Sequence, residues 1–333
     1  MKKNFPAFLR CLCCLCALLC TALFFGCALT KHMALDALSD SLAGADKKGK
    51  AVKPKAPENS LMPVLTGESD PVLMGDFFPT ALKLYEIMAA QNPDHQGLSV
   101  MTGSLYVMYA NAFVQTPADM LDPSQYVLQA EEQKRAKLHY LRGRSYALRA
   151  LELRYPGFTA ALLSGSLDTA AGYIAKLQLA DVAAAYWAGA GWLGAFSADP
   201  LDTQALKTLP CVVALLEKAA ELDPDYNNGA VWDALTAFYA AAPAKFGGDM
   251  ARARFASAQA FRVSKGETPG PYITYATALC VPQQDAEGFK ENLKKALAID
   301  PNSRPQERLS VTIAQKKALW LLQHVDDYFI QWD

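Results

Sequence analysis

The sequence predicts an all-α protein built from stacked helical hairpins, an α-solenoid or superhelix. A phrase that occurs four times carries this prediction: an apolar helical run ends, a proline follows, and a new helix begins. The four prolines are Pro93, Pro156, Pro224 and Pro301. Apolar residues recur at helical spacing through almost the whole body, without the alternation that is typical of strands. A repeated helix–turn–helix unit is typical of stacked hairpins.

The first 26 residues have the parts of a secretory signal peptide. Two lysines and an arginine precede an apolar run over residues 12–25, which is rich in Leu and Cys. The run is shorter than the roughly 20 apolar residues of a membrane-spanning helix. We therefore expect residues 1–26 to be cleaved off, with an uncleaved membrane anchor as the alternative.

A cysteine directly follows this run. The Gly26-Cys27 pair resembles the cleavage site of a bacterial lipoprotein signal, with Phe24 where a Leu is usual. The resemblance implies that Cys27 becomes a lipid-bearing N-terminus that carries palmitate or similar chains, and more than one chain anchors a protein stably. We therefore expect a periplasmic protein that is lipid-anchored to a cell-envelope membrane, with the membrane leaflet undetermined.

Residues 27–75 have the composition of a flexible tether. The stretch from 45 to 57 is polar, rich in Lys and punctuated by Pro, and such composition buries too little apolar surface to fold. A solvated tether is the expectation, although its lysines would also suit anionic lipid. The remaining residues, 76–333, are expected to form one TPR-like all-α domain.

Net charge and cysteine content limit the partners and the disulfide bonds that the chain can have. The chain has a net charge of −1, and cleavage of the signal leaves 29 basic against 33 acidic residues, a net charge of −4. Nucleic acid is thereby disfavoured as a partner, because it needs a basic face. Of eight cysteines only Cys211 and Cys280 lie in the body. Either a disulfide between them or two separate buried thiols fits the sequence.

The helices follow from their apolar stripes. Residues at i, i+3, i+4 and i+7 are apolar over 81–88 and 212–219, and related spacings occur over 289–297 and 314–329. Each pattern places one apolar stripe on one helix face. These stretches are therefore expected to be amphipathic helices that pack together.

The turns between helices have their own pattern. Asn92, Asp223 and Asp300 each precede one of the prolines. Asn and Asp cap free amide groups at a helix start, and Pro fits a first helical turn because it has no N–H. We expect these residues to cap the next helix, and the turn at Tyr155, which lacks such a residue, to be looser.

Small residues indicate close helix packing. Residues 183–192 consist of Ala and Gly apart from three aromatics, and Ala is frequent over 240–242 and 251–260. The helix–Pro–helix phrase fits the tetratricopeptide repeat (TPR) in part. Its anchors lie farther apart than one repeat of roughly 34 residues, so the domain is expected to be TPR-like.

Several stretches of the body resemble those of one protein family and occur in the same order. They cover residues 81–86, 92–95, 109–115, 141–144, 150–158, 186–187, 222–226, 247–249, 272–285 and 315–322. The chain is similar to TatT, the T component of TPR-protein-associated TRAP transporters. The Val-Pro-Gln-Gln-Asp segment at 281–285 and the C-terminal helix at 315–322 are the most distinctive parts, because ordinary TPR proteins lack them. The long tether and the uncapped turn at Tyr155 depart from the family pattern.

The resemblance implies a transport accessory. It implies a lipoprotein that partners the substrate-binding P subunit of a TRAP transporter, assembles as a homotrimer and has a pore or cleft in each protomer. The implied ligand is a small hydrophobic molecule or organic acid. The alternative function is a TPR scaffold lipoprotein for envelope protein assembly, which a neighbouring outer-membrane assembly gene would favour.

No catalytic constellation is apparent, so we expect no enzyme activity, no cofactor and no metal. The four histidines, His32, His95, His139 and His324, form no metal-binding pair. His95 follows Asp94 at a helix start, where a capping or surface role is expected. The pair Asp326-Asp327 is expected to be a solvated helix end, because hard cations need several convergent oxygens.

Aromatic residues are the candidates for a pore lining. Tyr186, Trp187 and Trp192 share one helix, where Gly191 leaves a gap four residues after Trp187, and Tyr272 and Tyr275 lie near each other on another helix. Such residues line apolar channels, and they equally fill cores. The candidate partner of a ligand carboxylate is Arg142, or the nearby Arg144, with a salt bridge to a glutamate as the alternative.

Overall fold

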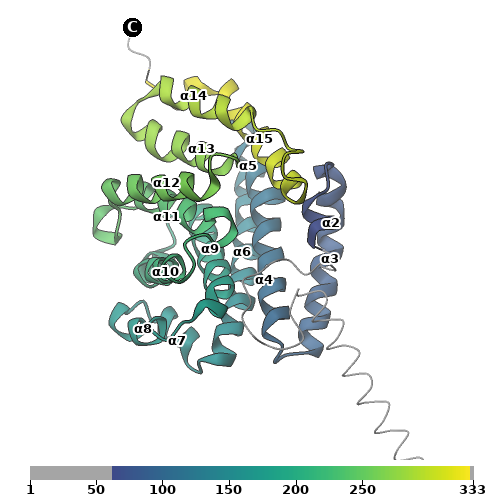
Figure 1. Cartoon of the computed structure of the whole chain (residues 1–333), viewed down its shortest axis with the longest axis vertical. Helices are drawn as coiled ribbons and strands as arrows, with labels where there is room; N and C mark the ends of the chain where they lie inside the picture. Colours follow the sequence, from purple (N-terminus) through teal and green to yellow (C-terminus); the bar gives the residue numbers. More distant parts are fainter. Residues whose placement is uncertain (1–61, 331–333) are drawn as a thin grey trace, which may run out of the picture.

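The computed structural model describes residues 62–330, and this part of the chain is helical without any strand. The prediction of an all-α fold is confirmed (Figure 1). The predicted signal peptide and Cys27 lie outside the described residues. Between residues 62 and 330, no helix is long and apolar enough to cross a bilayer.

The α-helices are joined mostly by short turns and 3₁₀ segments. They are α2 (Met62–Thr66), α3 (Pro71–Gln91), α4 (Gln96–Tyr109), α5 (Thr116–Asp119), α6 (Tyr126–Arg154), α7 (Phe158–Leu163), α8 (Leu167–Ile174), α9 (Val182–Ala198), α10 (Thr203–Leu222), α11 (Ala230–Ala241), α12 (Met250–Ser264), α13 (Gly270–Thr274), α14 (Ala286–Leu297) and α15 (Arg308–Gln323). Two π-helices, η1 (Ala110–Gln115) and η6 (Tyr275–Cys280), continue α4 and α13.

The helical body begins earlier than predicted. Helices α2 and α3 both start before residue 76, and the Asp70 carboxylate caps α3 by accepting hydrogen bonds from the N–H groups of Val72 and Leu73. Met74 is buried at the first turn of α3. The polar residues at 66–70 hide this start in the sequence. The boundary between the tether and the body therefore lies before residue 76.

Successive helices stack on one another. Helix α6 is 29 residues long and packs against both α4 and α9, which also contact each other. The stack continues from α9 through α10, α11 and α12 to α13 and α14 (Figure 1). Neighbouring helices in the chain are thus mostly neighbours in space, as in a solenoid of helical hairpins.

Glycines bring the three central helices close together. A Cβ atom on Gly103 of α4 or on Gly143 of α6 would lie 2.8 Å from the carbonyl oxygen of the other glycine. A Cβ on Gly191 of α9 would lie 2.9 Å from the Tyr140 carbonyl oxygen. The predicted close packing at small residues is therefore observed, and the backbone of α6 fills the gap at Gly191.

The four prolines lie in turns between helices, as predicted, but the predicted caps are wrong. Asn92 and Asp223 end α3 and α10 as C-caps and do not cap the next helix. His95 caps α4, because its Nδ1 accepts a hydrogen bond from the Leu98 N–H at 2.9 Å. Asp300 accepts from the Asn302 N–H within its own turn. Each turn runs several residues past its proline, so the next helix starts beyond the reach of the predicted cap.

The turn at Tyr155 is held from the preceding helix. The Glu152 carboxylate accepts hydrogen bonds from the N–H groups of Gly157 and Thr159 at 2.6 and 2.8 Å. These bonds lower the pKa of Glu152. Gly157 has a φ of 91°, which favours glycine. Glu152 thus takes the place of the absent cap. The turn at Tyr155 is therefore held by hydrogen bonds and is not looser, as was expected from the sequence.

The solenoid closes on itself. Helix α15 packs against α2 and α3, and the Arg308 guanidinium donates a hydrogen bond to the Gly67 carbonyl oxygen at 3.1 Å. Contacts therefore run in a closed ring through α3, α4, α6, α9, α11, α13 and α15 (Figure 1). The repeated phrases in the sequence did not predict this closure.

Cys211 and Cys280 are two free, buried thiols in separate hydrophobic clusters. Burial raises the pKa of both thiols, that of Cys280 to about 11. Of the two readings that fit the sequence, the structure has two separate thiols and no disulfide between them.

Candidate functional site

Two of the predicted pore residues meet on the side of α9 that faces α11. The rings of Tyr186 and Trp187 are 4.9 Å apart, and Tyr226, in the 3₁₀ segment η4 (Tyr226–Gly229), lies 5.4 Å from Tyr186. Trp187 and Tyr226 are half-buried and Tyr186 is buried. A side-chain hydrogen bond also joins Trp187 and Tyr226. The three rings form an aromatic cluster between the two helices.

The segment beside this cluster has an uncommon backbone. Asn227, Asn228 and Gly229 have φ values of 47°, 55° and 84°. Non-glycine residues rarely adopt such values, and these conformations concentrate at functional sites. The Asn227 side chain hydrogen-bonds Tyr186. Asn228 donates to Glu307 at 2.8 Å, so the segment is fixed from both sides.

A carboxylate completes the site from α11. Asp233 is half-buried, and Thr274 of α13 is near enough to lower its pKa. Its Oδ2 lies 3.3 Å from the position that a Cβ on Gly270 would occupy. Burial raises the pKa of Asp233 to about 6, against which Thr274 acts. Burial is the main cause that raises the pKa of Tyr186, and the negative charge of Asp233 adds to it.

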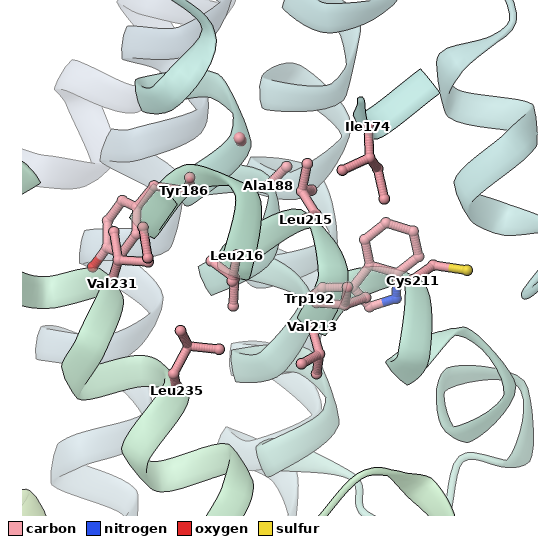
Figure 2. Packing of buried hydrophobic residues seen from close by; sticks show 14 of the residues in the cluster. Ile174, Tyr186, Ala188, Trp192, Cys211, Val213, Leu215, Leu216, Val231 and Leu235 are labelled. Carbon is pink, nitrogen blue, oxygen red and sulfur yellow. The ribbon is translucent and has the colours of Figure 1, made fainter. Parts of the chain in front are cut away.

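Trp192 belongs to the core. It is 1% exposed, and the Arg144 guanidinium lies 4.6 Å from the centre of its ring. Figure 2 shows Tyr186 and Trp192 apart from each other within the same cluster. The position of Trp192 therefore fits core packing, the alternative reading of this residue.

The other candidate residues lie in two further places. Tyr272 and Tyr275 both pack against Phe261, with ring centres 4.8 and 6.2 Å apart. Arg142 lies over the ring of Tyr106, and its Nε is 3.6 Å from a Glu86 carboxylate oxygen. The structure thus brings Tyr186 and Trp187 together and separates them from Arg142, whose contact with a glutamate is the alternative that the sequence left open. A pore-lining role stays a prediction for all six residues.

Sequence reasoning missed Tyr226, Asn227, Asp233 and Thr274. A signal for Asp233 is present, because it is the one charged residue in the apolar run 229–242. The Asn-Asn-Gly sequence at 227–229 is also typical of left-handed turns. Thr274 carries no comparable signal. Among residues 62–330, no group of three side chains is placed to hold a metal ion.

Comparison with known proteins identifies the family. The model of the family described as "TRAP transporter T-component" matches residues 67–329. A protein of Treponema pallidum (strain Nichols), described only as "Uncharacterized protein", is 43% identical over 305 residues, which cover 92% of this chain and 94% of that protein. The chain belongs to the TRAP transporter T-component family. The resemblance predicted from the sequence is thereby confirmed, and this is a family of transporter accessory proteins, not a class of enzyme.

The segments most distinctive of a T component have structural roles here. The Gln284 side chain accepts a hydrogen bond from the Ile330 N–H at 2.9 Å and donates to the Tyr328 carbonyl oxygen at 3.4 Å. Asp285 caps α14. The Gln315 amide donates to carbonyl oxygens at and just beyond the end of α14. These side chains fix the C-terminal helices that close the ring.

A second candidate surface of the T component is a groove of about 490 Å³ between α11 and α12. Trp232 and Phe255 form an aromatic wall, with ring centres 6.0 Å apart. At the other end the Arg252 guanidinium lies 4.2 Å from the ring centre of Tyr239 and pairs with Glu217. Phe255 is 59% exposed. An exposed aromatic beside a charged group is typical of protein-binding surfaces.

Replacing Asp233 by asparagine is expected to stabilise the T component at neutral pH. The folded-state pKa of about 6 lies above the ordinary 3.8, so ionisation of Asp233 disfavours the folded state above pH 6. This cost falls as pH drops from 6 toward 4. At 1.36 kcal/mol for each pKa unit the limit is about 3 kcal/mol, and partial exposure reduces the expectation to about 1–2 kcal/mol.

Thermal unfolding at several pH values checks this prediction. The melting temperature of D233N should exceed that of the wild type most at pH 8, and the difference should vanish near pH 4. Tyr186 from α9 and Thr274 from α13 are the polar groups that interact with Asp233. The control is Asp225→Asn, since the Asp225 side chain is 74% exposed. A difference that does not change with pH would contradict the prediction.

Proposed function

We propose that this T component is a lipid-anchored periplasmic subunit that docks the substrate-binding P subunit of a TRAP transporter and passes a small ligand through its interior. Family membership over residues 67–329 is the observation that carries the proposal. Lipid on Cys27 and assembly as a homotrimer complete the proposal.

The groove between α11 and α12 is our proposed docking surface for the P subunit. Phe255 is exposed to solvent, and the neighbouring Arg254 donates a hydrogen bond to the uncharged Gln283 side chain at 3.3 Å. Within residues 62–330 no carboxylate forms an ion pair with Arg254. A P-subunit surface with an apolar side chain next to a carboxylate would complement both residues.

Phe255→Asp is expected to weaken binding of the P subunit at least 100-fold. The change removes an aromatic anchor and places a charge in the groove, and central aromatic anchors carry about 2–4 kcal/mol of binding energy. Titration of the purified P subunit of a TRAP transporter from the same organism against the mature T component measures the affinity.

The control for that titration is Leu201→Asp. Leu201 is 87% exposed between α9 and α10, and its variant should bind as the wild type does. Wild-type affinity of F255D would exclude the groove as the docking surface. No complex with the wild type at high micromolar concentration would overturn docking itself and favour an envelope-assembly scaffold.

A further inference from the structure

We propose that the outer face of helix α3 is a docking site for residues 33–44 of the same chain, which form a short amphipathic helix on it. This surface is separate from the groove between α11 and α12. The proposal does not depend on the proposed function, because neither the P subunit nor a transported ligand takes part in the contact.

Helix α3 exposes an apolar stripe along most of its length, at one edge of the body (Figure 1). Leu73, Phe77, Leu84 and Ile87 have exposed fractions between 42% and 55%. At 3.6 residues per turn, these four positions fall within a sector of about 80° on one side of the helix. The side that faces the core holds a second apolar set, Met74, Phe78, Ala81, Leu82, Tyr85 and Ala89.

Helix α3 is therefore apolar on both sides, which is unusual at a protein surface. A surface helix normally has a polar outer side, and a helix that is apolar all round is normally buried. Of the 21 residues of α3 only Asp76, Lys83 and Glu86 are charged, and the last two pair with each other at 2.6 Å. The outer side is thus expected to be covered in the working protein.

The sequence that precedes the described residues contains a segment of matching pattern. Leu35, Leu38 and Leu42 recur at i, i+3 and i+7, whereas Asp36 and Asp40 fall on the other side of a helix. Neither glycine nor proline occurs in 33–43, and the glycine that follows at position 44 is typical of a helix end. Residues 33–44 therefore have the pattern of an amphipathic helix, unlike the polar stretch from 45 to 57.

The two apolar stripes agree in length. Leu73 and Ile87 are fourteen positions apart, which corresponds to about 21 Å along a helix axis, and residues 33–44 as a helix would be about 18 Å long. One docked segment would therefore cover most of the stripe.

The connection between the two helices is also long enough. Residues 45–61 span up to roughly 55 Å when extended, whereas α3 is about 31 Å long. Only four residues separate α2, where the described part of the chain begins, from α3. The segment can therefore reach any part of the outer face.

The charges beside the stripe favour an acidic segment. Lys83 and Arg142 of α6 lie on the side of α3 that faces α6, with side chains 63% and 47% exposed, and both contact the single carboxylate of Glu86. Residues 33–44 carry Asp36 and Asp40 and no basic residue, so their net charge is −2. Opposite charges at this distance attract, although salt weakens the attraction.

A second copy of the chain or a membrane fits the stripe less well. A stable interface between two proteins buries about 800 Å² on each partner, whereas a stripe about 21 Å long and one helix diameter wide offers roughly 200 Å². A helix that lies on a membrane is usually rich in Lys and Arg on its polar face, and α3 has one lysine. A single short helix therefore suits the stripe best.

Docking would change the reach of the tether. With lipid on Cys27, residues 28–32 alone would connect the anchor to the docked segment, and they span at most about 20 Å. The undocked tether could extend to about 120 Å. Docking would therefore hold the body close to the membrane, with α3 toward it. This consequence, unlike the docking itself, rests on the proposed lipid anchor.

Hydrogen exchange followed by mass spectrometry tests the docking. The mature chain carries Cys27→Ser in every sample, so that it stays unlipidated. An isolated helix of this length is marginal in water, so slow exchange of the amides at 35–43 requires docking. We expect these amides to exchange at least ten times more slowly than in Leu84→Asp, which places a charge within the stripe. The matched control is Leu167→Asp in α8, where Leu167 is 45% exposed and the helix packs on α7 and α10.

A disulfide provides a second measurement that does not depend on exchange rates. Leu38 and Thr80 lie near the midpoints of the two stripes, so Leu38→Cys with Thr80→Cys should form a disulfide within one chain on mild oxidation. Leu38→Cys with Leu167→Cys is the control pair and should not form one.

Several results would overturn the proposal. These are fast exchange at 35–43 in the parent chain, slow exchange that persists in L84D, or a disulfide that forms equally in the control pair. A disulfide between two chains would make a second copy the occupant of the stripe. Slow exchange that appears only when anionic lipid vesicles are added would make the membrane the occupant. Either result would replace the proposed contact.

Discussion

Gly143→Ala is expected to lower the free energy of unfolding by about 3 kcal/mol, the upper range for overpacking a tight site. The new Cβ would lie 2.7 Å from Cγ2 of Val107 and 2.8 Å from the Gly103 carbonyl oxygen. The Val107 side chain has rotamers to change, but the Gly103 oxygen belongs to the backbone of α4. Relief therefore requires α4 and α6 to move apart along the central contact of the fold.

Urea denaturation followed by circular dichroism measures this loss. The matched control is Gly172→Ala in α8, where a new Cβ would have no atom within 4 Å. The control should be stabilised by up to about 1 kcal/mol, because alanine favours helix more than glycine does. Equal stability of the two variants would mean that the α4–α6 contact is not as close as the structure shows.

The same glycines show what the sequence could predict. Small residues over 183–192 predicted close helix packing, and α9 does pack closely on α6. The sequence could not predict which helix packs against Gly191. The partner is the backbone at Tyr140, about fifty positions earlier in the chain. The contact between Arg308 and Gly67, which closes the ring, was unpredictable for the same reason. No local sequence pattern encodes a contact between the two ends of the body.

The turns were predictable in position but not in detail. Each proline ends its helix because it cannot continue the hydrogen-bond pattern, and this is a local effect. The cap depends on how many residues the turn contains, which packing decides. Hence His95 caps α4, while Asn92 ends α3.

The candidate site was predictable only in part. Tyr186 and Trp187 were found because aromatics are rare among the small residues of α9, but that signal also selected Trp192. Trp187 is half-buried between two hydrophobic clusters, whereas Trp192 is enclosed by one of them. Helix α9 is apolar around its whole surface. The spacing of its apolar residues therefore cannot show which face would line a pore and which face packs in the core.

Trp192→Ala is therefore expected to act on stability and not on ligand binding. Removal of a fully buried tryptophan costs about 3–5 kcal/mol, because a cavity remains where the ring was. Here the ring also covers Arg144, whose buried Nε has no hydrogen-bond partner and whose pKa is lowered by burial. Without the ring this cation would lose its cation–π contact, which places the expected loss at the upper end of that range.

A double-mutant cycle separates the two contributions. Arg144→Met removes the charge at similar length, so the loss caused by W192A should be smaller in the R144M background by about 0.5–2 kcal/mol. Trp187→Ala is the matched control, because that ring is half-buried and its loss should cost less stability. Equal losses for W187A and W192A in urea denaturation would contradict the assignment of Trp192 to the core.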